Sequence, residues 1–176
     1  YIKDNANDTI LNCTIENAYN GINISGGNSF FDPYSTEITG CTFSNITDTQ
    51  LVSCIYVNSS DGILIRDCIV ETEMPIGYSA GIITEYCPTN GVIIIDNEIN
   101  NSTAGIAVIQ SSPYIARNII TGLSGTGTGI LLDNSNGTIE YNIVNNFQKS
   151  FSASYSSPYL LKNTFAEKKK KNMDLT

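Results

Sequence analysis

The stretch Ile94-Ile95-Asp96-Asn97-Glu98-Ile99 places an asparagine between two apolar residues, and its pattern returns along the whole chain. The pattern consists of an apolar residue, two variable residues, a Cys or Asn, one variable residue and a second apolar residue. It occurs seven times, with the Cys or Asn at Cys13, Cys41, Cys68, Asn97, Asn118, Asn142 and Asn163. Successive copies of that position are 28, 27, 29, 21, 24 and 21 residues apart. Periods of about 20 to 50 residues are typical of solenoids and other repeat folds.

Two further marks recur, the first after six of the repeats and the second in five of them. A small residue followed by alternating apolar positions begins at Gly21, Cys54, Gly81, Gly105, Gly129 and Ser150. A second small residue precedes a turn at Ser60, Cys87, Ser111, Ser135 and Ser156. Alternation with period two indicates strands that place one side chain inward and the next outward. Each repeat therefore offers three strands, of three to five residues, that end at turns.

Such short strands bury an apolar face only when repeats stack on one another in parallel register. The sequence predicts an all-β parallel β-helix of about seven coils over residues 9–165. Residues 1–8 are expected to form an N-terminal lead-in, and residues 166–176 a Lys-rich tail or linker. Unpaired strand edges at the two ends need cover, so neighbouring coils, domains or subunits are expected to cap the solenoid.

The composition agrees with this prediction. Among the apolar residues are 26 Ile against 9 Leu and 8 Ala, and β-branched side chains favour strands over helices. Only 15% of the residues are charged, whereas 21 Asn and 35 Ser or Thr supply most of the polarity. Turns therefore account for most of the polar residues.

The charge and the missing residue types exclude several function classes. A net charge of −8 argues against a nucleic-acid partner, which normally meets a basic surface. The chain has no His, which removes Ser-His-Asp and Cys-His catalysis and the zinc sites that use His. No run of about 18 apolar residues is present, so no membrane span is expected in this segment. No cofactor or metal is predicted, because the thiols fall in three columns; Ca²⁺ is left open without a specific motif.

These repeat units resemble the parallel β-helix repeats of the pectin-lyase-like superfamily, in the carbohydrate-binding and sugar-hydrolase branch that includes NosD-like periplasmic proteins and archaeal surface-layer proteins. The resemblance implies a right-handed coil, and it favours an extracytoplasmic location: secreted, cell-surface or periplasmic. It leaves the activity open, since the superfamily spans lyases, hydrolases, epimerases and non-catalytic surface modules.

Stacking would place the seven Cys and Asn positions in one column. Asparagines in such a column can hydrogen-bond from rung to rung and to the turn backbone. Cysteine is small and readily buried, so Cys13, Cys41 and Cys68 are interpreted as packing residues of the same turn. A disulfide between adjacent rungs is an open alternative.

Asn-x-Ser/Thr sequons are about twice as frequent as the composition predicts, and they are the acceptor motif of surface N-glycosylation. The candidates are Asn7, Asn12, Asn23, Asn45, Asn58, Asn100, Asn101 and Asn136. Asn-rich turns could produce the same excess without any modification.

Candidate site residues fall into three groups. Tyrosine rings can cover the apolar face of a sugar, which singles out Tyr34, Tyr78 and Tyr86 in or beside the longer loops. Glycoside hydrolysis needs paired carboxylates, for which the candidates are Glu71, Glu73 and Glu85. Lyase or epimerase chemistry needs a base beside a charge neutraliser, which points to an outward column of Asp67, Asp96 and Arg117. Solvated acids, loop-packing aromatics and a surface ion pair are the structural alternatives.

The leading hypothesis is a non-catalytic extracytoplasmic β-helix that serves as a cell-surface scaffold or binds a surface polysaccharide or other glycan. The first alternative is a polysaccharide-active lyase, hydrolase or epimerase, or its β-helical part. The second is a NosD-like periplasmic accessory protein. The absence of any legible catalytic motif favours the first hypothesis.

Overall fold

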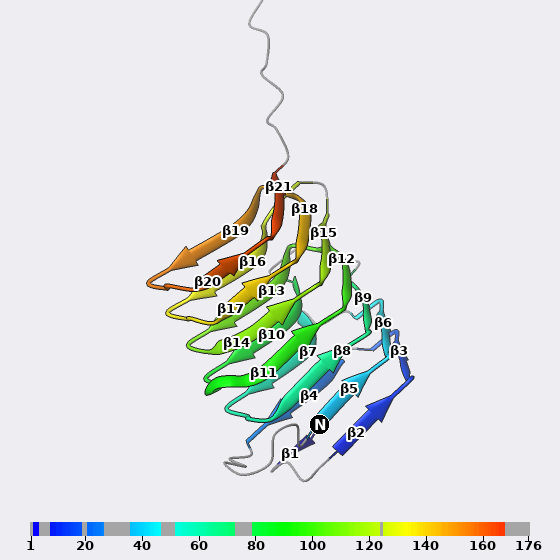
Figure 1. Ribbon diagram of the computed structural model, residues 1–176. Helices are drawn as coiled ribbons and strands as arrows, with labels where there is room; N and C mark the ends of the chain where they lie inside the picture. Colours follow the sequence, from blue (N-terminus) through cyan, green and yellow to red (C-terminus); the bar gives the residue numbers. More distant parts are fainter. Residues whose placement is uncertain are drawn as a thin grey trace, which may run out of the picture.

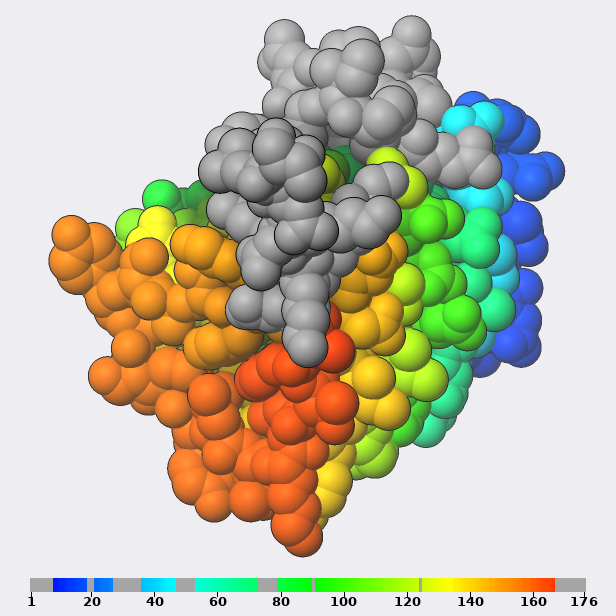
Figure 2. All heavy atoms as spheres, turned by 90° about the horizontal axis from the view of Figure 1, so that it is seen from above, coloured from blue at the N-terminus to red at the C-terminus, as the bar shows by residue number. Residues whose placement is uncertain are grey.

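The computed structural model describes residues 2–3, 8–18, 21–26, 36–46, 52–72, 79–123 and 125–167. These residues form 21 strands in three parallel sheets of seven strands each, and none of them is helical. The sheets wrap one shared core, with each coil stacked on the preceding one (Figure 1). The view from above in Figure 2 shows the coils following one another in layers from blue to red. The all-β parallel solenoid predicted from the repeats is thereby confirmed.

Each sheet collects every third strand. Sheet A contains β1 (Ile2–Lys3), β4 (Ile22–Ser25), β7 (Val52–Asn58), β10 (Ser79–Glu85), β13 (Ala104–Ile109), β16 (Thr128–Asp133) and β19 (Lys149–Ser154). Sheet B contains β2 (Asp8–Leu11), β5 (Thr36–Thr39), β8 (Ile63–Arg66), β11 (Thr89–Ile95), β14 (Ser112–Ala116), β17 (Thr138–Glu140) and β20 (Tyr159–Leu161). Sheet C contains β3 (Thr14–Glu16), β6 (Thr42–Ser44), β9 (Ile69–Glu71), β12 (Glu98–Ser102), β15 (Ile119–Gly122), β18 (Ile143–Phe147) and β21 (Thr164–Glu167).

The repeated apolar positions stack in register and form the core. In sheet B, one inward column consists of Ile10, Ile38, Ile65, Ile94, Ile115, Ile139 and Leu160. The five middle members of this column are at most 1% exposed. Because each coil supplies the same branched side chain at the same place, the isoleucine excess of the composition is a direct result of this stacking.

The small residue in each repeat is required by packing inside sheet A. A Cβ added to Gly105 would lie 2.2 Å from Ile120 Cγ2 and 2.6 Å from the carbonyl oxygen of Gly129. At Gly81 it would lie 2.5 Å from Ile99 Cγ2. The position therefore faces the wall of sheet C, where a large side chain does not fit. Cys54 and Gly81 are the third residues of β7 and β10, and these two strands reach seven residues and exceed the predicted length.

The corner between sheets B and C has a constant backbone geometry. The residue before each Cys or Asn rung has a positive φ in all seven coils: Asn12, Gly40, Asp67, Asp96, Arg117, Tyr141 and Lys162. This left-handed conformation turns the chain sharply, and it points the side chain away from the core. The corner thus presents one outward side chain in every coil except that of Gly40. No described helix is long and apolar enough to cross a membrane.

Candidate functional site

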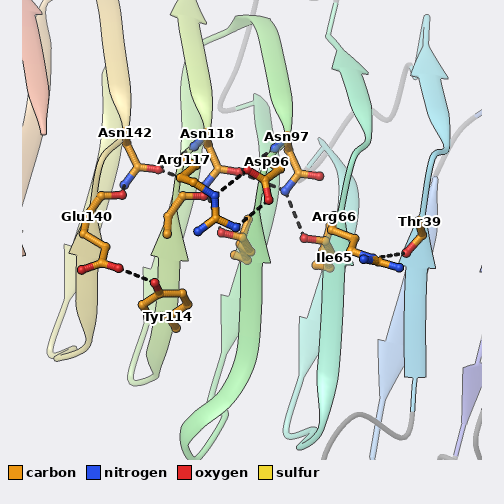
Figure 3. Close-up of polar contacts among 12 residues, drawn as sticks. Thr39, Ile65, Arg66, Asp96, Asn97, Tyr114, Arg117, Asn118, Glu140 and Asn142 are labelled. Carbon is orange, nitrogen blue, oxygen red and sulfur yellow. Dashed lines mark hydrogen bonds and ion pairs between the residues drawn. The ribbon is translucent and has the colours of Figure 1, made fainter.

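Asparagine side chains link the last four coils through the corner between sheets B and C. The buried Asn118 donates from Nδ2 to the Ile94 carbonyl at 2.9 Å and to Asn142 Oδ1 at 2.9 Å (Figure 3). Its Oδ1 accepts both the backbone N–H and the side-chain Nδ2 of Asn97, each at 3.0 Å. The same pattern joins Asn142 to Asn163. Asn97, Asn118 and Asn142 therefore each bond to the coil on both sides.

The cysteine rungs make one of these contacts, the bond to a carbonyl of the preceding coil. Cys68 Sγ donates to the Ile38 carbonyl at 3.6 Å, as the asparagine Nδ2 does to the coil below, and to the Arg66 carbonyl at 3.2 Å. Cys41 Sγ donates in the same way to Ile10, at 3.5 Å. Burial raises the pKa of Cys68 to about 11, which keeps this thiol protonated. All five cysteines are free thiols, so the geometry assigns these two to packing and hydrogen bonding.

A second ladder occupies the corner between sheets A and B, at the small residues that precede each turn. Ser135 Oγ accepts the Ser111 backbone N–H at 3.2 Å, and Ser156 Oγ accepts that of Ser135 at 2.9 Å. Ser111 Oγ accepts the N–H of Cys87 at 2.9 Å. The sequence marks these positions as small, but their role as hydrogen-bonding rungs depends on the register between coils, which the unequal repeat lengths obscure.

Charged side chains form cross-coil pairs at the outer edge of sheet B. Arg117 makes a two-point contact with Asp96, from Nε to Oδ1 at 2.7 Å and from Nη2 to Oδ2 at 2.6 Å. This contact lowers the pKa of the Asp96 carboxyl. Arg66 on β8 pairs with Glu37 on the neighbouring strand β5, at 2.9 Å. Asp67, Asp96 and Arg117 each precede a rung in successive coils, as predicted, and Arg117 pairs with Asp96; their role in catalysis stays a prediction.

Tyrosines gather on the outer face of sheet B and the turns beside it. Tyr114 and Tyr159 occupy the same register position on β14 and β20, with Thr138 of β17 between them. Strands in a sheet lie about 4.8 Å apart, so the two positions are about 10 Å apart along the solenoid axis. Tyr159 is 61% exposed, and the Tyr114 hydroxyl donates to the Glu140 carboxylate of the next strand (Figure 3).

The turns on both sides of sheet B carry three more exposed tyrosines. Tyr86 and Tyr155 lie at the corner shared with sheet A and are 52% and 92% exposed. Tyr141 lies at the corner shared with sheet C, where the Lys162 ammonium is 5.4 Å from its ring centre. Of these five tyrosines, only Tyr86 was among the residues singled out from the sequence. Tyr114 and Tyr159 could have been aligned by counting from the rungs, since both, like Thr138, come four residues before an asparagine rung.

A separate polar contact lies on the outer face of sheet A. The Tyr56 hydroxyl on β7 donates to the Glu85 carboxylate on the neighbouring strand β10. It also accepts from Asn58 Nδ2 at 3.1 Å. Burial and Glu85 together raise the pKa of Tyr56 to about 12. The ring packs beside Ile83 and Ala107, so this face is a small apolar cluster with one polar edge.

The remaining predicted catalytic residues do not come together. Glu71 lies on β9 of sheet C, and the paired strand places it beside Asn100. Glu85 is the last residue of β10, in sheet A, so it belongs to a different sheet from Glu71. Glu73, Tyr34 and Tyr78 lie outside the described residues. No three His, Cys, Asp or Glu side chains in the described ranges are placed to hold a metal ion.

The structure separates the sequons by how their side chains are engaged. Amides that hydrogen-bond to another side chain are those of Asn45, Asn58 and Asn100. Asn23 is half-buried, whereas Asn12, Asn101 and Asn136 are exposed. Asn7 lies outside the described residues.

Comparison with known proteins adds one match. A family model described as a right handed beta helix region matches residues 30–173, most of the chain. Neither the curated proteins nor the solved structures contain a match. The matched family agrees with the hand that the repeat resemblance implied.

Proposed function

Because this chain belongs to the right-handed β-helix family, whose members share a fold and not one activity, we propose its function from the surface: a non-catalytic extracytoplasmic module that binds carbohydrate on the outer face of sheet B. The binding face is defined here by Tyr86, Tyr114, Tyr141, Tyr155 and Tyr159. The solenoid beneath it acts as a rigid scaffold that holds these side chains in register.

The observation that carries the proposal is the segregation of the tyrosines. Six tyrosines are described, and five of them lie on sheet B or at its two corners; the exception is Tyr56. A tyrosine ring offers an apolar face to a sugar ring, and its hydroxyl serves a sugar hydroxyl, at a low cost in side-chain entropy. Exposed aromatic side chains that gather on one face are the usual sign of a binding surface.

Hydrogen-bonding groups accompany the rings. Glu140 and the pair of Asp96 and Arg117 lie beside Tyr114 (Figure 3). Thr138 lies between Tyr114 and Tyr159 in the register of sheet B. Sugars present both donors and acceptors, and this set supplies both. The spacing of about 10 Å between Tyr114 and Tyr159 follows the solenoid axis, so an extended glycan laid along the rod would reach both rings.

The same geometry favours binding over cleavage. Glycoside hydrolysis needs two carboxyl groups at about 5 Å or about 6.5 to 9.5 Å. Glu71 ends β9 at the corner between sheets C and A, whereas Glu85 ends β10 at the corner between sheets A and B. Asp96 is engaged by Arg117, and the Glu140 carboxylate by Tyr114. A polysaccharide-active enzyme and a NosD-like accessory protein stay predictions from the sequence, without an observation on this surface that favours them.

A glycan array with the purified chain, followed by calorimetric titration of the best ligand, tests the proposal. Tyr159→Ala should weaken binding about 2- to 10-fold, the worth of one aromatic contact. Tyr56→Phe on sheet A is the control and should leave affinity unchanged. Absence of binding to every arrayed glycan, or equal affinity of wild type and Tyr159→Ala, would refute the binding face. Release of new reducing ends or unsaturated uronates that disappears in Arg117→Ala would instead support an enzyme.

A further inference from the structure

One column of side chains on the outer face of sheet B runs through five consecutive coils. The column occupies one register position on β8, β11, β14, β17 and β20, which lie side by side in Figure 1, and consists of Leu64, Ile93, Tyr114, Thr138 and Tyr159. The residues on either side of Leu64 and of Ile93 are buried in the core, so the column itself faces outward. We call this column the track.

The track repeats at the spacing of sugar residues. Neighbouring strands lie about 4.8 Å apart, so the track advances by that distance from one coil to the next. One pyranose in an extended chain advances the chain by nearly the same distance. A polysaccharide that runs straight along the solenoid axis therefore places one sugar over each residue of the track, whereas a chain that coils leaves this line.

The order of side chains along the track also suits such a chain. When equatorial bonds join the sugars from position 1 to position 4, each sugar is turned over relative to the one before it, so alternate sugars present the same face. Tyr114 and Tyr159 are two coils apart and meet alternate sugars, with Thr138 under the sugar between them. Leu64 and Ile93 continue the apolar surface in the two preceding coils.

The charges on this face favour a neutral ligand. No residue of the track is charged, and the Glu140 carboxylate beside it accepts from the Tyr114 hydroxyl. The only cation on the described strands of sheet B is Arg66, which is already paired with Glu37 at 2.9 Å. A polyuronate would bring one carboxylate per coil without a free cation on these strands, whereas neutral sugar hydroxyls can bond to Thr138 and Glu140.

We propose that the track binds a neutral, extended polysaccharide whose sugars are joined by equatorial 1,4 linkages, with one sugar over each coil from Leu64 to Tyr159. This inference rests on the carbohydrate-binding function proposed above and names the ligand class of that site. Chains of β-1,4-linked glucose, mannose, xylose or N-acetylglucosamine have this shape and no charge. Chains of α-1,4-linked or β-1,3-linked glucose curve, and polygalacturonate is charged.

Calorimetric titration of the full chain with matched oligosaccharides tests the ligand class. The probes are five-unit oligomers of the four β-1,4-linked sugars, of α-1,4-linked and β-1,3-linked glucose, and of galacturonate. The best β-1,4-linked oligomer should bind at least about 10-fold more tightly than the curved and the charged ones. Its affinity should rise with each added sugar until the track is filled at five, by about 2- to 10-fold for a sugar that covers a tyrosine.

Two variants with the same substitution locate the ligand on the track. Ile93→Thr removes apolar contact in the middle of the track and keeps a β-branched side chain in β11, so it should weaken binding of the five-unit oligomer about 2- to 5-fold. Ile143→Thr makes the same change on the outer face of sheet C, where Ile143 is 45% exposed, and should bind as wild type. Circular dichroism of both variants establishes that they fold.

The outcomes separate this inference from the function on which it rests. Absence of binding to every glycan overturns both. Binding of an α-1,4-linked, β-1,3-linked or galacturonate oligomer as tight as that of the best β-1,4-linked one keeps the binding function and overturns the ligand class. Equal weakening by Ile93→Thr and Ile143→Thr, or no weakening by either, overturns the placement of the ligand on the track.

Discussion

Replacement of Asn118 by Ala tests whether the amide column stabilises the solenoid. The change removes the acceptor of the Asn97 N–H and the donor to the Ile94 carbonyl, both buried in the corner. Asn97 Nδ2 keeps its bond to Ile65 at 3.1 Å, so the Asn97 N–H is the group left without a partner, while the Ile94 carbonyl loses its side-chain donor within the β11–β14 ladder. An unsatisfied buried polar group costs about 1 to 3 kcal/mol and a lost hydrogen bond about 1 kcal/mol, which gives a loss of about 3 kcal/mol.

Replacement of Asn118 by Cys separates the cost of losing the acceptor from the cost of losing the donor. A thiol at this position can donate to the Ile94 carbonyl, as Cys68 does to Ile38, and leaves only the Asn97 N–H without an acceptor. The expected loss is then about 2 kcal/mol, about 1 kcal/mol less than that of Asn118→Ala. Asn145→Ala, on the outer face of β18, is the matched control and should stay within about 0.5 kcal/mol of wild type.

Urea unfolding followed by far-UV circular dichroism measures these differences, provided that the slope with denaturant is the same for all variants. Amide hydrogen exchange should locate the effect at Asn97. The reasoning fails if Asn118→Ala costs less than about 1 kcal/mol, or if the Cys variant is as unstable as the Ala variant.

Three other predictions follow from the described contacts. Gly105→Ala forces a Cβ to within 2.2 Å of Ile120 Cγ2 and should cost about 1 to 3 kcal/mol in urea unfolding, whereas Ala104→Ser on the outer face should cost little. Cys13 is the exposed thiol and should react with a water-soluble maleimide in the folded protein, while Cys41, Cys54, Cys68 and Cys87 should react only on unfolding; burial raises the pKa of Cys54 to about 12. Early labelling of a buried cysteine, seen by mass spectrometry, would contradict this. Arg117 lowers the pKa of Asp96, so the pair stabilises the fold above the ordinary aspartate range and loses this effect as pH falls through the lowered value; Arg117→Ala should cost under about 1 kcal/mol near neutral pH and nothing in strong acid.

The fold was predictable because the core uses every coil in the same way. Ile94 and Ile115 recur beside a rung, and one repeat is enough to show which of their neighbours face inward. The repeat also marks Gly105 as a small residue. The sequence does not show why it must be small, which is the close approach of Ile120 from another sheet.

The binding face was much less predictable. Tyr114 and Tyr159 share a register position although they are 45 residues apart, and only the alignment of coils of 24 and 21 residues shows this. Outward positions are free to vary from coil to coil, so no periodicity marks them. Selection by loop length favoured Tyr34 and Tyr78, which lie outside the described residues, over the tyrosines of sheet B.

The rung positions also make the coil a unit that can be added or removed. Residues 97–117 span one turn of the chain from one asparagine rung to the residue before the next. Loss of these 21 residues would join Asp96 directly to Asn118 and restore the order Ile94-Ile95-Asp96-Asn118-Ile119-Ile120, which is the same motif. The repeating order of core and corner positions is therefore kept when a whole coil is duplicated or deleted. The length of the rod can change in evolution without a change in the core positions.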